Sequence, residues 1–271
     1  MNNNMIDPNS DPNEGKLKAF AGKNMGFLDH MEDLRWTILK TGVVFLIAFV
    51  VTAIFLPYAS QVLNWPLNRA FASLKTSQPM GLVTTSPMAV FSVYLQICFL
   101  GGLLFALPFG LYFLGGFVGP ALTKKEKGLL IPVCLGSLVL FLSGAAFAYF
   151  FLVPSAIKVS IYFNHMLGFD LVWSADRYYG LLVWMILGMG GGFQFPMVIQ
   201  ILVYLGIVEV RKLKSLRKVM IVVFFIISAI ITPTPDPLTQ SMVALPMYAL
   251  YELSLLVATR VENRRKAREE A

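Results

Sequence analysis

Residues 27–56 read FLDHMEDLRWTILKTGVVFLIAFVVTAIFL, a short acidic segment that leads directly into a long apolar run. The apolar part, residues 37–56, has the length that a helix needs to cross the hydrocarbon core of a bilayer, about 20 residues. The whole chain of 271 residues is 57% hydrophobic and only 14% charged, which is too apolar for a soluble domain. The chain is therefore predicted to be an integral membrane protein.

Apolar runs recur along the rest of the chain. We predict membrane spans at approximately 37–56, 91–116, 129–152, 180–205, 219–231 and 241–258. Together they form one six-helix membrane domain, residues 26–258, so the predicted fold class is an all-α integral membrane protein. Residues 1–25 are rich in Asn, Asp, Pro and Gly and are expected to be a disordered tail, and residues 259–271 form a basic tail.

The loops between these spans differ sharply in Lys and Arg. The two tails, the second loop and the fourth loop hold 17 of these residues, and the alternate loops hold 4. By the positive-inside rule this bias predicts that both termini are cytoplasmic. The net charge of +7 then reflects topology, and nucleic acid is not an expected partner. No apolar stretch precedes residue 27, so no cleavable signal peptide is expected and a bacterial inner membrane is the simplest location.

Prolines and span lengths predict the shape of the bundle. Several prolines break up the outer segment 57–90, which is long enough to form a structured periplasmic cap of short helices. Pro108 and Pro196 fall within spans two and four and should kink them. Span five, 219–231, provides only ~20 Å of helix, so we expect spans five and six to be short and the bilayer around them to be thinned.

Among the polar residues inside the predicted spans, we single out Gln96, Gln194 and Glu252. Gln96 is expected to make an ordinary contact between helices. Gln194 stands between a glycine run and a proline, where it either packs in the bundle or faces a partner or substrate. Glu252 is either a protonated structural acid or a proton-sensing group, and the sequence leaves both readings open.

Patterns typical of catalysis, metals or cofactors are absent from the sequence. The run Gly188–Gly192 has no following Lys-Ser/Thr, so its glycines indicate close helix packing rather than a phosphate cradle. His30 and His165 have no companions at metal-ligand spacing, and no serine stands in a nucleophile motif. We therefore expect a protein that is not an enzyme and that draws energy for any transport from partners or an ion gradient.

In their order, the remaining motifs resemble the TatC family, the multi-span core subunit of the twin-arginine protein translocase. The resemblance covers nearly the whole chain beyond residue 26. The motifs that carry it are HMEDLR (30–35), SP (86–87), FVGPAL (117–122) with Glu126, FAYF (147–150) with Pro154 closing span three, FQFP (193–196), TPTPDPLTQ (232–240) and PMYALYE (246–252).

The resemblance implies a receptor for the signal peptides of folded precursors that carry consecutive arginines. It also implies single-span partners of the TatA and TatB type, self-association in the lipid bilayer, and export driven by the proton-motive force. By motif, the arginine-binding acids of the family fall on Asp33 and Glu126, with Leu34 and Arg35 beside them. Carboxylates suit this role because guanidinium groups bind them through paired, charge-assisted hydrogen bonds.

The same resemblance assigns contacts with partner helices to Gln194, Pro196, Ile231 and Gln240. Many members of the family have glutamate where this chain has Gln194, and an amide cannot titrate. A proton-coupled role is therefore not expected at this position. The proline-rich loop before span six suits a rigid outer turn with Asp236 exposed, and Asp236 joins Glu252 as a polar residue with a candidate role.

Two other functions fit the sequence. An ion-coupled secondary transporter would show an internal repeat or paired charges inside the membrane, and we find neither. A scaffolding membrane protein would gather partners without contacting cargo.

Overall fold

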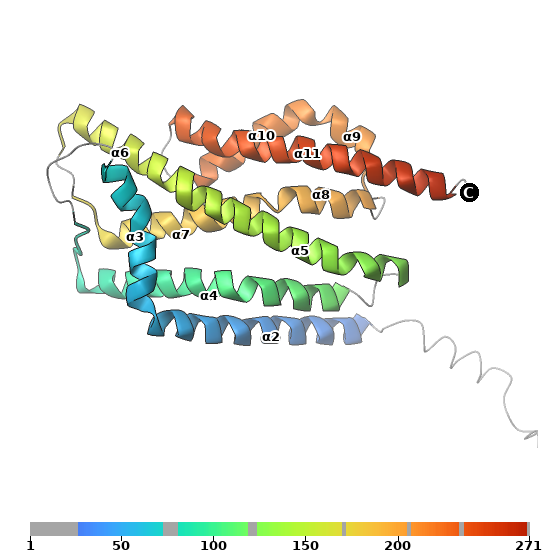
Figure 1. Cartoon of the computed structure of the whole chain (residues 1–271), viewed down its shortest axis with the longest axis horizontal. Coiled ribbons are helices and arrows are strands. Elements are labelled where there is room, and N and C mark those ends of the chain that lie inside the picture. The colour runs from blue at the N-terminus through green and yellow to red at the C-terminus, as the bar shows by residue number, and fades with distance from the viewer. Residues whose placement is uncertain are drawn as a thin grey trace, which may run out of the picture.

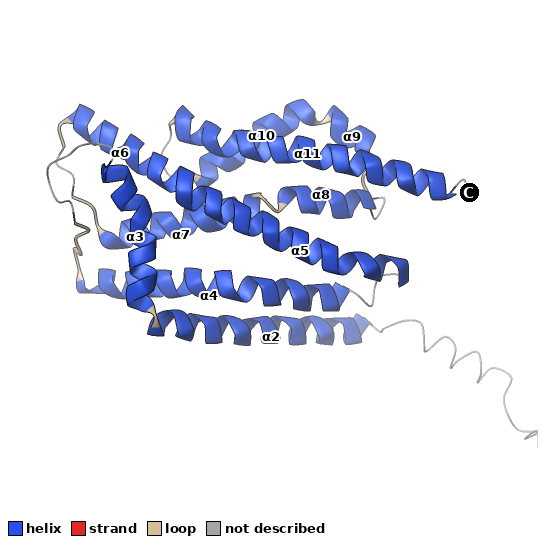
Figure 2. Ribbon diagram, in the orientation of Figure 1, coloured by secondary structure: helices blue, strands red, loops and turns tan. Residues whose placement is uncertain are grey.

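The structure is a computed structural model that describes residues 27–72, 81–118, 124–169, 172–204, 207–232 and 236–269. The side chains of residues 27–30, 118, 124–130, 204, 261 and 263–269 are not described. Regular structure in these ranges is helical, apart from an isolated parallel bridge between Val83 and Ser174. The all-helical fold class is therefore confirmed (Figure 2). The predicted tail of residues 1–25 lies outside the described residues.

The helices follow one another in a single series (Figure 1). Their bounds are α2 Phe27–Ile54, α3 Leu56–Ala72, α4 Pro87–Val118, α5 Lys124–Phe147, the π-helical segment η2 Ala148–Leu152, α6 Val153–Leu167, α7 Ala175–Gly192, α8 Phe195–Tyr204, α9 Val210–Ser215, α10 Arg217–Ile231 and α11 Pro237–Glu269.

Most of these helices lie side by side and form an elongated bundle (Figure 1). Helix α2 lies at one edge and packs mainly on α4, which in turn contacts α5 and α7. At the opposite edge, α11 packs on α8 and α10. Helix α7 runs through the middle, where Leu182, Met185 and Met189 are fully buried. The core is therefore thick around α7 and thin at α2.

Helix α3 crosses the end of the bundle and is held there by tyrosines (Figure 1). Pro66 inside α3 has no N–H, so the carbonyl of Val62 loses its helical donor. The Tyr149 hydroxyl donates to that carbonyl at 2.6 Å, and the Tyr178 hydroxyl donates to the Leu63 carbonyl at 2.6 Å. The expected cap is thus a 17-residue helix in the described part of this segment, rather than several shorter ones.

Among the residues that the structure describes, five helical segments are long and apolar enough to cross a membrane, namely Met31–Ile54, Pro87–Phe117, Ile131–Leu167, Ala175–Val203 and Pro237–Arg260. They correspond to predicted spans one to four and six. The predicted fifth span lies in α10, which has 15 residues. A short fifth helix is thus confirmed, because about 20 residues are needed to cross the hydrocarbon core.

The helices of spans three and six both extend beyond the predicted spans. Helix continues past Pro154 to Leu167, so the level at which span three leaves the membrane stays a prediction. The π-helical segment Ala148–Leu152 links α5 to α6 without a break. Helix six was expected to be short, and this expectation is wrong. Helix α11 has 33 residues and continues through a C-terminal stretch rich in strong helix formers.

Prolines act differently in the two helices where kinks were expected. Near Pro196 the helix breaks, since α7 ends at Gly192 and α8 starts at Phe195, with a turn at residues 193–194. The backbone N–H groups of Met197 and Val198 restart the helix on the carbonyl of Gln194. Pro108, by contrast, lies within α4, which is continuous from Pro87 to Val118.

Glycines let α5 and α7 approach closely, as the sequence indicated for the run Gly188–Gly192. A Cβ on Gly190 would lie 2.9 Å from the Phe141 ring, and one on Gly144 would lie 2.7 Å from the backbone oxygen of Met189. Small residues of this kind allow tight contact between membrane helices.

Gly144→Ala should therefore destabilise the bundle, because the new methyl group meets backbone that cannot move aside. We expect a loss of about 1–3 kcal/mol, seen as a lower thermal unfolding temperature in detergent. The matched control is Gly42→Ala, also within a helix, where a Cβ has no atom within 4 Å. Equal unfolding temperatures for the two variants would contradict the packing described for α5 and α7.

Candidate functional site

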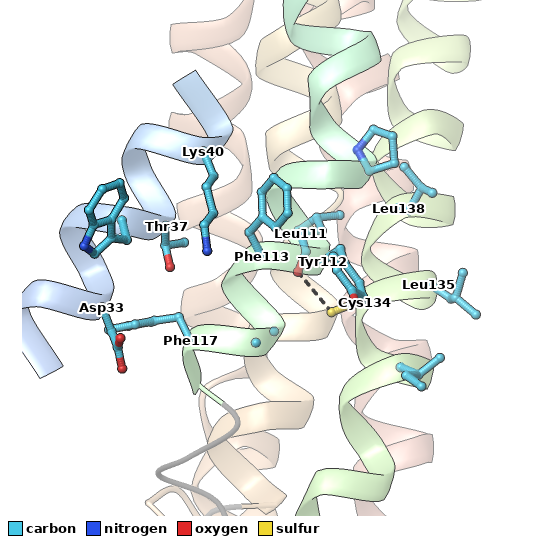
Figure 3. A pocket seen from close by; sticks show the side chains of 15 residues that line it. Asp33, Thr37, Lys40, Leu111, Tyr112, Phe113, Phe117, Cys134, Leu135 and Leu138 are labelled. Atoms are coloured by element: carbon cyan, nitrogen blue, oxygen red, sulfur yellow. Dashed lines mark hydrogen bonds between the residues drawn. The ribbon is translucent and has the colours of Figure 1, made fainter. Parts of the chain in front are cut away.

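A pocket of about 660 Å³ lies between α2, α4 and α5, toward the end of the bundle where α2 begins and α4 ends (Figure 3). Helix α2 contributes Asp33, Trp36, Thr37 and Lys40. The walls from α4 and α5 are mostly apolar and aromatic, with Leu111, Tyr112, Phe113, Phe117, Leu135 and Leu138 among the lining residues. The pocket therefore combines one polar wall with an apolar interior.

Helical spacing places the polar side chains on one face of α2. Asp33, Thr37 and Lys40 follow at i, i+4 and i+7, the spacing of neighbours along a helix face. The face is held against α4 by small residues, since a Cβ on Gly110 would lie 3.1 Å from Thr41 and one on Gly101 would lie 2.5 Å from Thr52. This close packing aligns α2 with α4 and so sets the pocket wall.

Asp33 is half-buried and lines the pocket near its edge. It forms no ion pair with another residue among those that the structure describes. Leu34 and Arg35 are exposed next to it and do not line the pocket. A half-buried carboxylate that lacks a protein cation is suited to bind an external one, because charge-assisted hydrogen bonds are stronger than neutral ones.

Glu126 lies on the first turn of α5, shortly before the pocket-lining Ile131. Its backbone is therefore at the end of the bundle that holds Asp33. The Glu126 side chain lies outside the described residues, and its expected part in arginine binding stays a prediction.

Lys40 is a pocket residue that the sequence analysis missed. It lies within the apolar segment Met31–Ile54, is exposed, and forms no ion pair within the described part of the chain. The signal that could have revealed it is the charge itself, because an ionised side chain inside a membrane span is costly and commonly functional.

The residues expected to contact partner helices lie where helices of this chain meet one another. The Gln194 amide donates to the Ser137 carbonyl at 2.7 Å and ties the α7–α8 turn to α5. The Gln240 amide donates to the Phe225 carbonyl at 3.0 Å and ties α11 to α10. Pro196 and Ile231 are buried. Each of the two glutamines therefore has an internal contact, and their contact with a partner stays a prediction.

Glu252 has a partner inside the chain, and its expected role as a structural or proton-sensing acid stays a prediction. The Arg217 guanidinium donates to its Oε2 at 2.7 Å, and the Tyr248 hydroxyl donates to its Oε1 at 2.9 Å. Arg217 begins α10 and Glu252 lies in α11, so the ion pair joins these two helices. Glu252 is thus an ion-paired carboxylate in this structure.

Asp236 is not exposed, contrary to expectation. Only 6% of the residue is accessible, because its carboxylate caps the start of α11. One oxygen accepts the Thr239 backbone N–H at 2.7 Å and the other accepts the Thr239 hydroxyl at 2.5 Å. Such capping satisfies a backbone N–H that has no partner within the helix. Asp236 therefore has a structural role in this turn.

The fold and this site define a multi-pass helical membrane protein with a pocket beside its first helix. The family model for the Sec-independent protein translocase protein (TatC) matches residues 29–246. The TatC protein of Koribacter versatilis is 35% identical over 268 residues, which cover 98% of this chain and 97% of that relative. The chain belongs to the TatC family.

Other comparisons agree with this assignment. The TatC protein of Aquifex aeolicus is 32% identical over 244 residues, which cover 89% of this chain and 98% of that protein. A crystal structure described as the twin arginine translocase receptor TatC superimposes with a TM-score of 0.71 at 32% identity, covering 86% of this chain and 99% of that one. The protein is therefore a non-enzymatic subunit of the twin-arginine translocase and a multi-pass protein of the inner membrane.

We expect the Arg217–Glu252 pair to couple α10 to α11. A double-mutant cycle of Arg217→Ala and Glu252→Ala should give a coupling energy of about 0.5–1 kcal/mol, small because both side chains are partly exposed. The measurement is thermal unfolding in detergent. Arg211→Ala combined with Glu252→Ala is the control, since Arg211 is exposed and is not paired with Glu252. Additive losses in the Arg217 cycle would contradict the coupling.

Proposed function

We propose that this protein receives signal peptides with consecutive arginines at the cytoplasmic end of the pocket, with Asp33 and Glu126 as the arginine ligands. The observation that carries the proposal is the half-buried Asp33 carboxylate, which has no protein cation beside it in the described residues and lines a pocket of about 660 Å³. Two guanidinium groups in succession need two acceptors, and α2 and α5 each bring one to this end of the bundle.

The proposal includes a topology of six spans with both termini in the cytoplasm. Its support is the concentration of Lys and Arg in the tails and alternate loops, together with the five long apolar helices. In this topology α10 is the short fifth span and α3 is the outer cap. Because α10 has 15 residues, we expect the bilayer beside it to be thinned.

The residues next to Asp33 support binding of an extended peptide. Leu34 is 39% exposed and Arg35 is exposed, so an apolar and a charged side chain border the carboxylate. The apolar walls from α4 and α5 begin within the pocket itself. In a signal peptide, apolar residues follow the arginines. The arginines can therefore lie at Asp33 while the apolar residues lie along the apolar walls of the pocket.

We propose that single-span subunits of the TatA and TatB type dock on the edge formed by α10 and α11, and that copies of this chain associate with one another. Val222, Ile226 and Ile230 are 58%, 56% and 62% exposed and follow one another at four-residue spacing on α10. They form an apolar stripe that a membrane helix can pack on. Gln240 ties α11 to α10 at this edge, and Gln194 ties the α7–α8 turn to α5, next to helix α8, which packs on α11. Export then draws on the proton-motive force.

Neutralising one of the two acids should impair binding of the arginine pair. Asp33→Asn and Glu126→Gln should each weaken binding of a twin-arginine signal peptide about 10- to 100-fold, because a charge-assisted bond is lost. The measurement is peptide affinity for the purified protein, accompanied by export of a folded precursor in cells.

Glu32→Gln is the matched control, since Glu32 is exposed on the same helix turn but does not line the pocket. It should bind the peptide like the unaltered protein. Normal affinity and export in both Asp33→Asn and Glu126→Gln would reject the site. Normal partner assembly without any peptide crosslink to this region would instead favour the scaffolding function.

Removing the Gln194 amide at the α7–α8 turn should weaken binding of single-span subunits more than binding of the signal peptide. We expect Gln194→Ala to lower co-purification of single-span subunits several-fold, because the turn loses its bond to Ser137, while peptide affinity stays unchanged. Gln96→Ala is the control, since Gln96 lies in α4, away from α10 and α11, and its amide donates to the Ser92 hydroxyl at 3.2 Å. If both variants retain partners equally, Gln194 contributes only to packing.

A further inference from the structure

We propose that the pocket binds the headgroup of an aminophospholipid, with the phosphate on Lys40 and the primary amine on Asp33. The inference goes beyond the proposed function, and it concerns the protein when no signal peptide is present. Its basis is a pair of opposite charges that face one pocket from the same helix without a protein partner for either in the described residues.

The first step concerns the Lys40 ammonium. Lys40 is exposed within the apolar segment Met31–Ile54, where an uncompensated ammonium is costly. Side chains on a helix tilt toward its N-terminus, and a lysine in a membrane extends its stem to bring the charge to a more polar region. Figure 3 shows Lys40 extending along α2 in the direction of Asp33. The ammonium therefore enters the pocket and requires an anion there.

The second step concerns the separation of the two charges. Asp33 and Lys40 are seven residues apart, a rise of about 10.5 Å along α2, and they form no ion pair with each other. The backward tilt of Lys40 shortens the distance between the charged groups. A zwitterion whose negative end lies deeper than its positive end satisfies both. The Thr37 hydroxyl lies between them and can donate to the same anion.

The third step identifies the zwitterion as a lipid. Pro108 and Leu138 line the pocket, and Leu138 lies at the level of Lys40 rather than that of Asp33 (Figure 3). An acyl chain fits beside these apolar residues. From the bilayer core outward, a phospholipid presents acyl chain, phosphate and then amine, the same order as Leu138, Lys40 and Asp33. A free phosphate or amine would leave the apolar wall without a partner.

Charge also selects among phospholipids. A headgroup that is only anionic places no cation beside the Asp33 carboxylate and is repelled by it. A trimethylammonium headgroup has no N–H to donate to this carboxylate. Phosphatidylethanolamine supplies both a phosphate for Lys40 and an ammonium for Asp33, so it is the occupant that we propose.

The test uses the full chain, purified in detergent with equal amounts of phosphatidylethanolamine, phosphatidylglycerol and phosphatidylcholine that share the same acyl chains. Native mass spectrometry then counts the lipids retained. We expect the unaltered protein to prefer phosphatidylethanolamine and Lys40→Gln to reduce its retention about tenfold. Lys40→Arg should keep it. Lys218→Gln is the matched control, because Lys218 is an exposed lysine near the start of another helix and lies outside the pocket.

A second variant separates the amine from the phosphate. Asp33→Asn should keep lipid retention but lose the preference for phosphatidylethanolamine over phosphatidylglycerol. Equal retention of the three lipids by the unaltered protein would overturn the proposal. So would an unchanged preference in both Lys40→Gln and Asp33→Asn, or the same loss in Lys218→Gln. No signal peptide is added, so these outcomes are independent of whether Asp33 binds arginine.

Discussion

Inside a bilayer every polar group must find its partner within the protein, and the rest of this structure depends on that constraint. Helices satisfy the backbone, and side chains complete what the helices leave open. The Thr52 hydroxyl donates to its own helix at the Ala48 carbonyl, and the Gln194 amide at the α7–α8 break donates to the Ser137 carbonyl of α5. Irregular backbone is therefore found where neighbouring helices supply its hydrogen bonds.

The same constraint separates a rigid part of the molecule from a more accessible one. Around α7, glycines allow contacts so close that an added Cβ would meet backbone. At α2 the packing rests mainly on α4, and most of this helix is exposed. A pocket forms between α2, α4 and α5, where helices meet without filling the space between them. The functional proposals all rest on this difference between a tightly packed core and an exposed edge, since a ligand or partner can bind only to residues that are not buried in the core.

Charges follow a related rule. Glu252 has a protein partner in Arg217, and Asp236 is used to cap a helix, so both acids stabilise the fold. Asp33 and Lys40 have no ion-pair partner in the part of the chain that the structure describes, and both face the pocket. Whether a charged side chain has a partner within the protein or faces the pocket thus depends on its surroundings and not on its residue type.

Apolar run lengths alone determined that this chain is a helical membrane protein, and five of its predicted spans correspond to long apolar helices, because hydrophobic length is a local property. The order of the motifs along the chain also identified the TatC family, because that order is written in the sequence itself. Sequence alone misjudged the exposure of Asp236 and the length of α11, since capping and helix extension depend on neighbouring backbone. The sequence analysis also missed Lys40 as a site residue, because only the structure shows that Lys40 and Asp33 line the same pocket. Only the tertiary structure decided which charges are paired and which face the pocket, because pairing requires helices far apart in sequence to meet.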